Sequence, residues 1–140
     1  RKEMQDEFLR LQGVLNKTIM FVTHDFDEAL RLADRIAIMK DGIIEQLDTP
    51  DNIVLNPATE YVKKFTQDVP REKVIKIESI MDPVDSTITS NIKISKNDLI
   101  NKVAEIILNS KEALNVIDPK DDKIVGSLNP SKVIKVLFGS

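Results

Sequence analysis

The chain has 140 residues, of which 41% are hydrophobic and 31% are charged, and its formal net charge is −3. This composition is typical of a globular protein with one ordinary domain or two small ones. Cysteine is absent and histidine occurs once, which excludes disulfides, thiolate metal sites and multi-histidine metal sites. No apolar run approaches the roughly 20 residues that a membrane span needs, so we expect a cytoplasmic chain. The six aromatic residues are not interleaved with a basic cluster, so we expect no nucleic-acid partner.

The first part of the chain predicts a helix followed by a buried strand. Residues 2–15 repeat apolar side chains at helical spacing, and Asp6 and Arg10 have the spacing of an i, i+4 ion pair. The continuous apolar and β-branched run from Ile19 to Thr23 predicts a strand that is buried on both faces. Burial on both faces is typical of a parallel sheet covered by helices.

A corner that carries the single histidine follows this strand. Asp25 and Glu28 have the spacing of a helix capping box, so a second helix is predicted to begin at once. His24 therefore lies at the carboxyl end of the strand, where open α/β sheets bind ligands. A histidine satisfied by backbone and solvent is the common alternative. After this helix, two short apolar segments meet at Asp41-Gly42, which predicts a tight β-hairpin.

From Val22 to Gly42 the sequence resembles the last third of the ATPase subunit of ATP-binding-cassette (ABC) transporters. The shared pattern is an apolar strand ending in Thr-His-Asp, a helix containing Glu-Ala, then Ala-Asp-Arg-Ile and a hairpin with glycine. Asp48-Thr49-Pro50 and Asn56-Pro57-Ala58 make the resemblance closest to subunits that drive uptake of glycine betaine, proline and related osmoprotectants. The resemblance implies an α/β fold of the P-loop type, of which this chain supplies a truncated carboxyl-terminal segment, and a transmembrane permease as partner.

The resemblance also implies that His24 is the catalytic switch histidine that contacts the γ-phosphate of ATP. Asp25 and Glu28 are better explained as capping residues than as catalytic ones. The sequence contains no G-x-x-x-x-G-K-[ST] loop, no signature loop and no metal-binding strand of the family. We therefore expect a carboxyl-terminal piece of a longer subunit, which uses ATP and Mg only when complete. We expect no metal site in the chain itself and no ATP hydrolysis by it alone.

Pro70 marks a predicted boundary between two domains. Short helices over 50–55 and 58–67 close the first region, residues 1–69, which we interpret as the end of a nucleotide-binding domain. Residues 70–78 are predicted to be a linker, and residues 79–140 a second domain. The elements predicted in that domain are an extended piece over 88–94, a helix over 96–109, strands over 113–117 and 123–128, and a helix over 130–138.

The order βαββα, headed by Ile80-Met81-Asp82-Pro83, resembles a cystathionine-β-synthase-type (CBS) domain. The predicted helix starts are a Ser95–Asp98 capping box and Asn129 before Pro130. A single CBS copy leaves an apolar sheet face and a helix flank uncovered. We therefore expect a second copy of the chain as partner, in a two-fold dimer, unless the longer protein carries a second CBS domain.

Paired CBS domains commonly bind adenine nucleotides, and the resemblance points to Ser127, Asn129 and Lys132 as the corresponding cofactor-binding candidates. Asn129 stands where Thr is usual, and Lys132 stands where an Asp that accepts from ribose hydroxyls is usual. An ammonium group donates but cannot accept, so a packing domain without ligand stays open beside a nucleotide sensor and a sensor of ionic strength.

The sequence thus leaves two classes of function. In the first, the chain is part of the ATP-hydrolysing subunit of an osmoprotectant importer, peripheral to the membrane and regulated by a CBS domain. In the second, it is a CBS regulatory or dimerisation module, and its ATPase remnant is inert.

Overall fold

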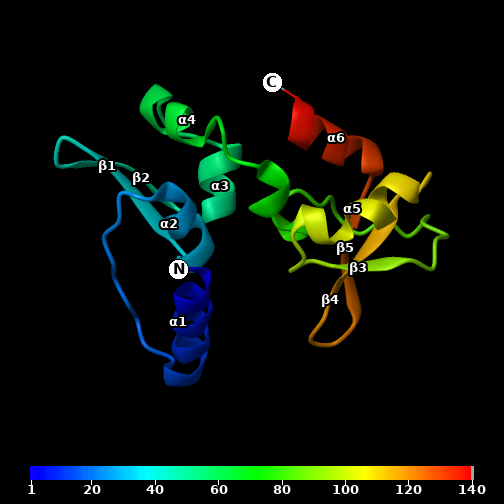
Figure 1. The fold of residues 1–140 in the computed structure, drawn as a ribbon. Coiled ribbons are helices and arrows are strands. Elements are labelled where there is room, and N and C mark those ends of the chain that lie inside the picture. Colours follow the sequence, from blue (N-terminus) through cyan, green and yellow to red (C-terminus); the bar gives the residue numbers. More distant parts are fainter. Residues whose placement is uncertain (140) are drawn as a thin grey trace.

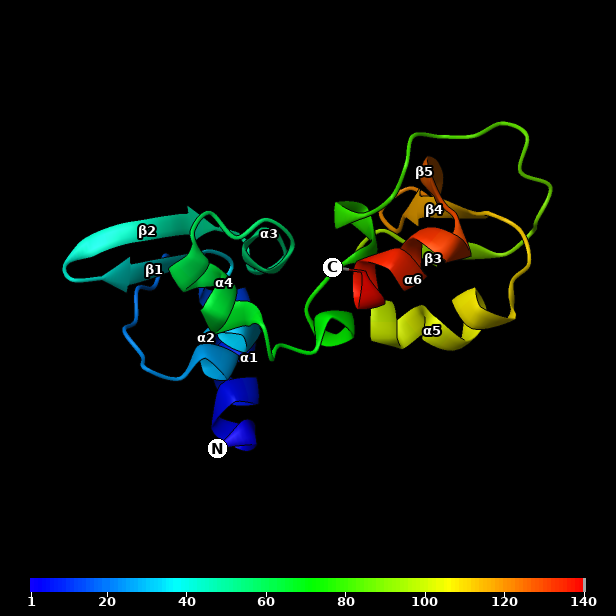
Figure 2. The same cartoon turned by 90° about the horizontal axis from the view of Figure 1, so that it is seen from above.

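A computed structural model describes residues 1–139, which form two lobes joined near helix α3 (Figures 1 and 2). The first lobe comprises residues 1–66, the second lobe comprises residues 71–139, and residues 67–70 connect them. The first lobe contains α1 (Lys2–Leu15), α2 (Phe26–Leu32), β1 (Ile36–Lys40), β2 (Ile43–Asp48), α3 (Pro50–Leu55) and α4 (Glu60–Thr66). The second contains two short 3₁₀ helices, η1 (Arg71–Lys73) and η2 (Ile77–Ser79), then β3 (Lys93–Ser95), α5 (Ile100–Asn109), β4 (Leu114–Asp118), β5 (Lys123–Leu128) and α6 (Pro130–Phe138).

The hairpin predicted in the first lobe is confirmed. Strands β1 and β2 pair antiparallel from Ile36 opposite Asp48 to Lys40 opposite Ile43. The connecting Asp41 and Gly42 have φ angles of 51° and 77°, the positive values that a two-residue hairpin turn requires. The short helices predicted on either side of residue 56 are also present as α3 and α4.

The strand predicted for Ile19 to Thr23 is wrong in this structure. These residues form an extended loop without strand pairing, and Met20 and Val22 are each 91% exposed. A central strand of a parallel sheet needs hydrogen-bonded neighbours on both sides, and residues 1–139 supply none for this segment. The first lobe therefore has a two-stranded antiparallel hairpin where a parallel sheet was expected.

Helix α1 forms as predicted, but its contacts differ from the expected ones. Arg10 donates to Glu7, with an Nη2–Oε1 distance of 2.6 Å, and Asp6 pairs with Arg31 of α2. The predicted Asp6–Arg10 pair is wrong because a tertiary contact with α2 takes Asp6. The apolar face of α1 is not buried either, since Met4 is 78% exposed.

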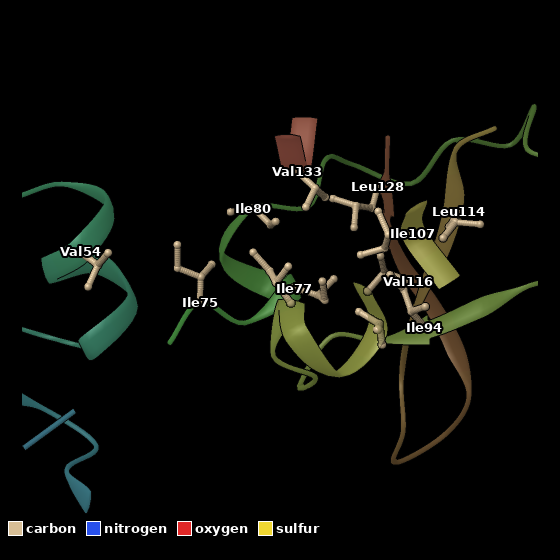
Figure 3. Packing of buried hydrophobic residues seen from close by; sticks show 12 residues of the cluster. Val54, Ile75, Ile77, Ile80, Ile94, Ile107, Leu114, Val116, Leu128 and Val133 are labelled. Carbon is tan, nitrogen blue, oxygen red and sulfur yellow. The ribbon is translucent and has the colours of Figure 1, made fainter. Parts of the chain in front are cut away.

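The second lobe has the predicted βαββα order. Its three strands form a sheet in the order β3-β4-β5, with β3 parallel to β4 and β4 antiparallel to β5. Helices α5 and α6 lie on the same side of this sheet (Figure 2). Alternating strand residues face the helices, and the resulting core contains Ile94, Val103, Ile107, Leu114, Val116, Leu128 and Val133 (Figure 3).

Helix α5 begins four residues later than the predicted Lys96. The backbone of residues 96–99 instead pairs with η2. Ile77 N donates to Asp98 O at 2.9 Å, and Glu78 N donates to Lys96 O at 3.0 Å. Ser95 accepts from Asn97 N in a local turn, so it does not cap the helix. Long-range backbone pairing has therefore overridden the local capping pattern.

The segment expected to be a linker, residues 70–78, is packed into the second lobe. Ile75 and Ile77 are completely buried, and Arg71 Nη1 donates to the carbonyl oxygen of Val136 at 2.7 Å. Figure 3 shows Ile75 between Val54 of α3 and Ile77. This segment connects the core of the second lobe with α3.

Candidate functional site

The histidine corner is held by three hydrogen bonds among its neighbours. Asp25 Oδ1 accepts from Glu28 N at 3.1 Å, which caps α2. Thr23 Oγ1 accepts from Asp25 N at 3.0 Å and donates to Glu28 Oε2 at 2.8 Å. These bonds fix the backbone on both sides of His24, although the preceding residues form no strand.

The predicted capping box is half present. Asp25 caps the helix as expected, but the carboxylate of Glu28 binds the hydroxyl of Thr23 instead of Asp25 N. Thr23 is the positioning residue that the sequence reasoning missed. A hydroxyl side chain two residues before a helix N-cap is a usable signal, because it can accept from the amide two residues ahead.

The imidazole of His24 lies exposed at the start of α2, beside a charged cluster. Arg1 Nη2 lies 3.0 Å from Asp25 Oδ2 and 3.8 Å from Glu28 Oε2. This arrangement leaves the ring accessible to a ligand, and its N–H can donate to an anion. The loop before α2 that carries His24 belongs to the first lobe, and the second group of candidates lies at β5 and α6 of the other lobe (Figure 1).

The structure places Ser127 and Lys132 beside the chain segment at Asp82, whereas Asn129 contacts Ser131 at the start of α6. Ser127 Oγ donates to Pro83 O at 2.7 Å, and Ser127 and Asp82 exchange two backbone hydrogen bonds of 2.8 and 2.9 Å. Lys132 Nζ lies 2.7 Å from Asp82 Oδ1. Each of these side chains is thus engaged within the chain.

Asn129 has the capping role that the sequence predicted. Its Oδ1 accepts from Ser131 N at 3.0 Å and from Ser131 Oγ at 2.9 Å, at the start of α6. Because the side-chain oxygen of Asn129 accepts both bonds, this residue stabilises the start of α6.

A cleft of about 870 Å³ separates the two lobes and contains none of the predicted site residues. Its lining residues belong to α1, α2 and the start of α3 in the first lobe, and to segments 73–79 and 97–99 in the second. Across residues 1–139, no cluster of three or more His, Asp or Glu side chains is placed to hold a metal ion. In the same residues, no helix has the length and apolar character to span a bilayer.

Comparison with known proteins finds clear relatives, although no model of a protein family matches the chain. The chain is 65% identical over 138 residues to the trimethylamine N-oxide transport system ATP-binding protein TmoW of Pelagibacter ubique, a match that covers 99% of the chain and 40% of that relative. It is 44% identical, with the same coverage, to the protein of that name from Ruegeria pomeroyi. It is 36% identical over 159 aligned residues to the glycine betaine/carnitine/choline transport ATP-binding protein OpuCA of Bacillus subtilis, covering 41% of it.

The chain therefore spans about 40% of the length of the curated relatives that it matches along its whole length. The match includes both the histidine corner and the second lobe, because it covers 99% of the chain. The chain belongs to the ATP-binding subunits of ABC transporters, and it corresponds to their carboxyl-terminal part.

Proposed function

We propose that this chain works within the ATP-hydrolysing subunit of an importer for small osmoprotectants that carry a trimethylated nitrogen. The names of the relatives support this solute class, since trimethylamine N-oxide, glycine betaine, choline and carnitine all contain that group. The complete subunit binds ATP and Mg, contacts a transmembrane permease and lies at the cytoplasmic face of the membrane. Glycine betaine, which the sequence analysis expected as a solute, belongs to this class, whereas proline has no trimethylated nitrogen.

The histidine corner carries the proposal for ATP hydrolysis. His24 donates an imidazole N–H to the γ-phosphate and stabilises the charge that develops there during transfer. The support is local: Thr23, Asp25 and Glu28 hold the corner by their own hydrogen bonds, so its shape does not depend on a paired strand. The exposed ring is available to a ligand brought by the rest of the subunit.

The test is ATP turnover by a full-length subunit that contains this chain, with His24→Ala compared with Asp27→Ala. Asp27 is exposed on the same helix, so its replacement controls for changes near the corner. We expect His24→Ala to lower kcat by about 100-fold, the usual effect of removing one preorganised donor, with a small change in KM. Unchanged turnover would remove this role from His24, and circular dichroism at the helix band confirms that the variant is folded.

We also propose that residues 79–140 form a CBS-type regulatory domain that pairs with a second copy of the chain. The βαββα order and the placement of both helices on one side of the sheet support the domain type. Exposed apolar side chains on both helices support the pairing: Ile106, Leu108, Ile134 and Phe138. Light scattering should give twice the chain mass, and Leu108→Lys, which replaces a 73% exposed side chain, should shift it to the monomer. A monomeric parent chain would refute the pairing.

The second lobe acts by packing rather than by binding an adenine nucleotide. Lys132 offers donors only and is already paired with Asp82, so it cannot accept from ribose hydroxyls. Ser127 is only 7% exposed, and its hydroxyl proton is donated to Pro83 O. Isothermal calorimetry of the chain with ATP and with AMP should give no binding heat. Saturable heat with either nucleotide that is lost in Lys132→Ala would establish the nucleotide site instead.

A further inference from the structure

Helix α3 places two consecutive residues in two different hydrophobic cores. Ile53 is fully buried with Ile36, Ile38 and Val62 in the core of the first lobe. Val54, which is 1% exposed, belongs to the core of the second lobe and faces Ile75 (Figure 3). Successive side chains of a helix point about 100° apart, so one short helix can serve both cores.

Asp51 adds a polar connection from the same helix. Asp51 is 7% exposed, and its Oδ2 accepts from Lys76 N at 2.7 Å and from Ser79 Oγ at 2.9 Å. Both donors belong to the second lobe, at the start and end of η2. A buried carboxylate is tolerated only when it is hydrogen-bonded, so these two bonds select the observed placement of the lobes.

The cleft described above lies between the lobes next to α3, and Thr49, Pro50 and Asp51 are among the residues that line it. Leu9 and Leu30 of the first lobe line one side of it, and Val74 and Leu99 of the second line the other. The joint between the lobes is therefore concentrated at α3, where it is both apolar and hydrogen-bonded.

We propose that α3 makes the two lobes a single cooperative unit, in which Asp51 is the positioning residue for the second lobe. Domains joined by a linker ordinarily move independently, and this joint removes that freedom. If the function proposed above is right, on which this consequence depends, α3 carries a change in the regulatory lobe to the lobe that holds His24. The proposed coupling between the two lobes requires no bound nucleotide.

Amide hydrogen exchange on the present chain tests the coupling. Ile53→Val removes one methylene from the core of the first lobe, and we expect it to accelerate exchange by about two- to tenfold in β1–β2. In a single cooperative unit, β4 and β5 must accelerate by the same factor. Ile43→Val is the matched control, because Ile43 is 68% exposed and its replacement should change neither lobe. Acceleration confined to the first lobe would overturn the proposal.

Scanning calorimetry tests the role of Asp51. The parent chain should unfold in one transition, and Asp51→Ala, which loses both hydrogen bonds, should unfold in two. Asp51→Asn retains one acceptor oxygen and should stay closer to the parent, whereas Asp68→Ala, at an exposed carboxylate, should match it. A single unshifted transition in Asp51→Ala would refute the positioning role. Because neither measurement contains ATP, failure here leaves the proposal for His24 untouched, and failure of His24→Ala leaves the coupling untouched.

Discussion

Gly126 on β5 is a position where the second lobe leaves no room for a side chain. A Cβ atom built there lies 2.7 Å from Met81 Sδ and 2.8 Å from the backbone oxygen of Asp82. Ordinary van der Waals contact begins at 3.4 Å, so both neighbours must move. Met81 can rotate away, but the Asp82 oxygen accepts from Ser127 N at 2.9 Å and cannot shift without straining that bond.

We predict that Gly126→Ala lowers the free energy of unfolding by about 1–3 kcal/mol, the usual range for overpacking. The assay is urea unfolding followed by circular dichroism, with the slope of the transition unchanged from the parent. Gly13→Ala is the control, because Gly13 lies inside α1 with no atom within 4 Å of the added Cβ. The same substitution there should stabilise the helix by about 0.5–1 kcal/mol, since glycine is a poor helix former.

The backbone contact makes this prediction refutable in two ways. If Gly126→Ala were as stable as the parent, the close approach of the Met81-Asp82 segment to β5 would be wrong. A Met81→Ala background removes the flexible neighbour and leaves the Asp82 oxygen in place. The Gly126→Ala penalty should persist in that background, and its complete disappearance would show that only the side chain was in the way.

Three further predictions concern other elements. Thr23→Val removes both hydrogen bonds of the hydroxyl and should accelerate amide exchange at the start of α2, whereas Thr23→Ser should not; equal protection in all three chains would contradict the positioning role. The Lys120 amide and the Lys96 ammonium lower the pKa of Asp118, so its stabilisation is present above its ordinary pKa of 3.8 and is lost as pH falls below it. The stability advantage of the parent over Asp118→Asn should therefore shrink as pH falls below about 4 in acid titrations of unfolding, and a pH-independent difference would refute this assignment. Gly42→Ala forces a φ of +77° on a side chain and should destabilise the hairpin by about 1 kcal/mol in thermal melts, and no change would argue against the observed turn.

Local patterns alone determined much of this molecule. Asp41-Gly42 specified the hairpin turn, Asp25 specified the start of α2, and Asn129 before Pro130 specified the start of α6, because each of these signals acts within a few residues. The βαββα order of the second lobe followed from hydrophobic periodicity in the same way. The membership of the ABC-transporter family was also readable from the residues around His24.

Only the tertiary structure decided the contacts between distant segments. The apolar run Ile19 to Thr23 has the composition of a buried strand, but a strand exists only where partners supply its hydrogen bonds. Asp6 binds Arg31 of another helix, and α5 starts late because residues 96–99 pair with the segment around Ile77. The two cores served by α3 were likewise invisible in the sequence, since helical periodicity shows which residues are buried but cannot assign neighbouring residues such as Ile53 and Val54 to separate cores.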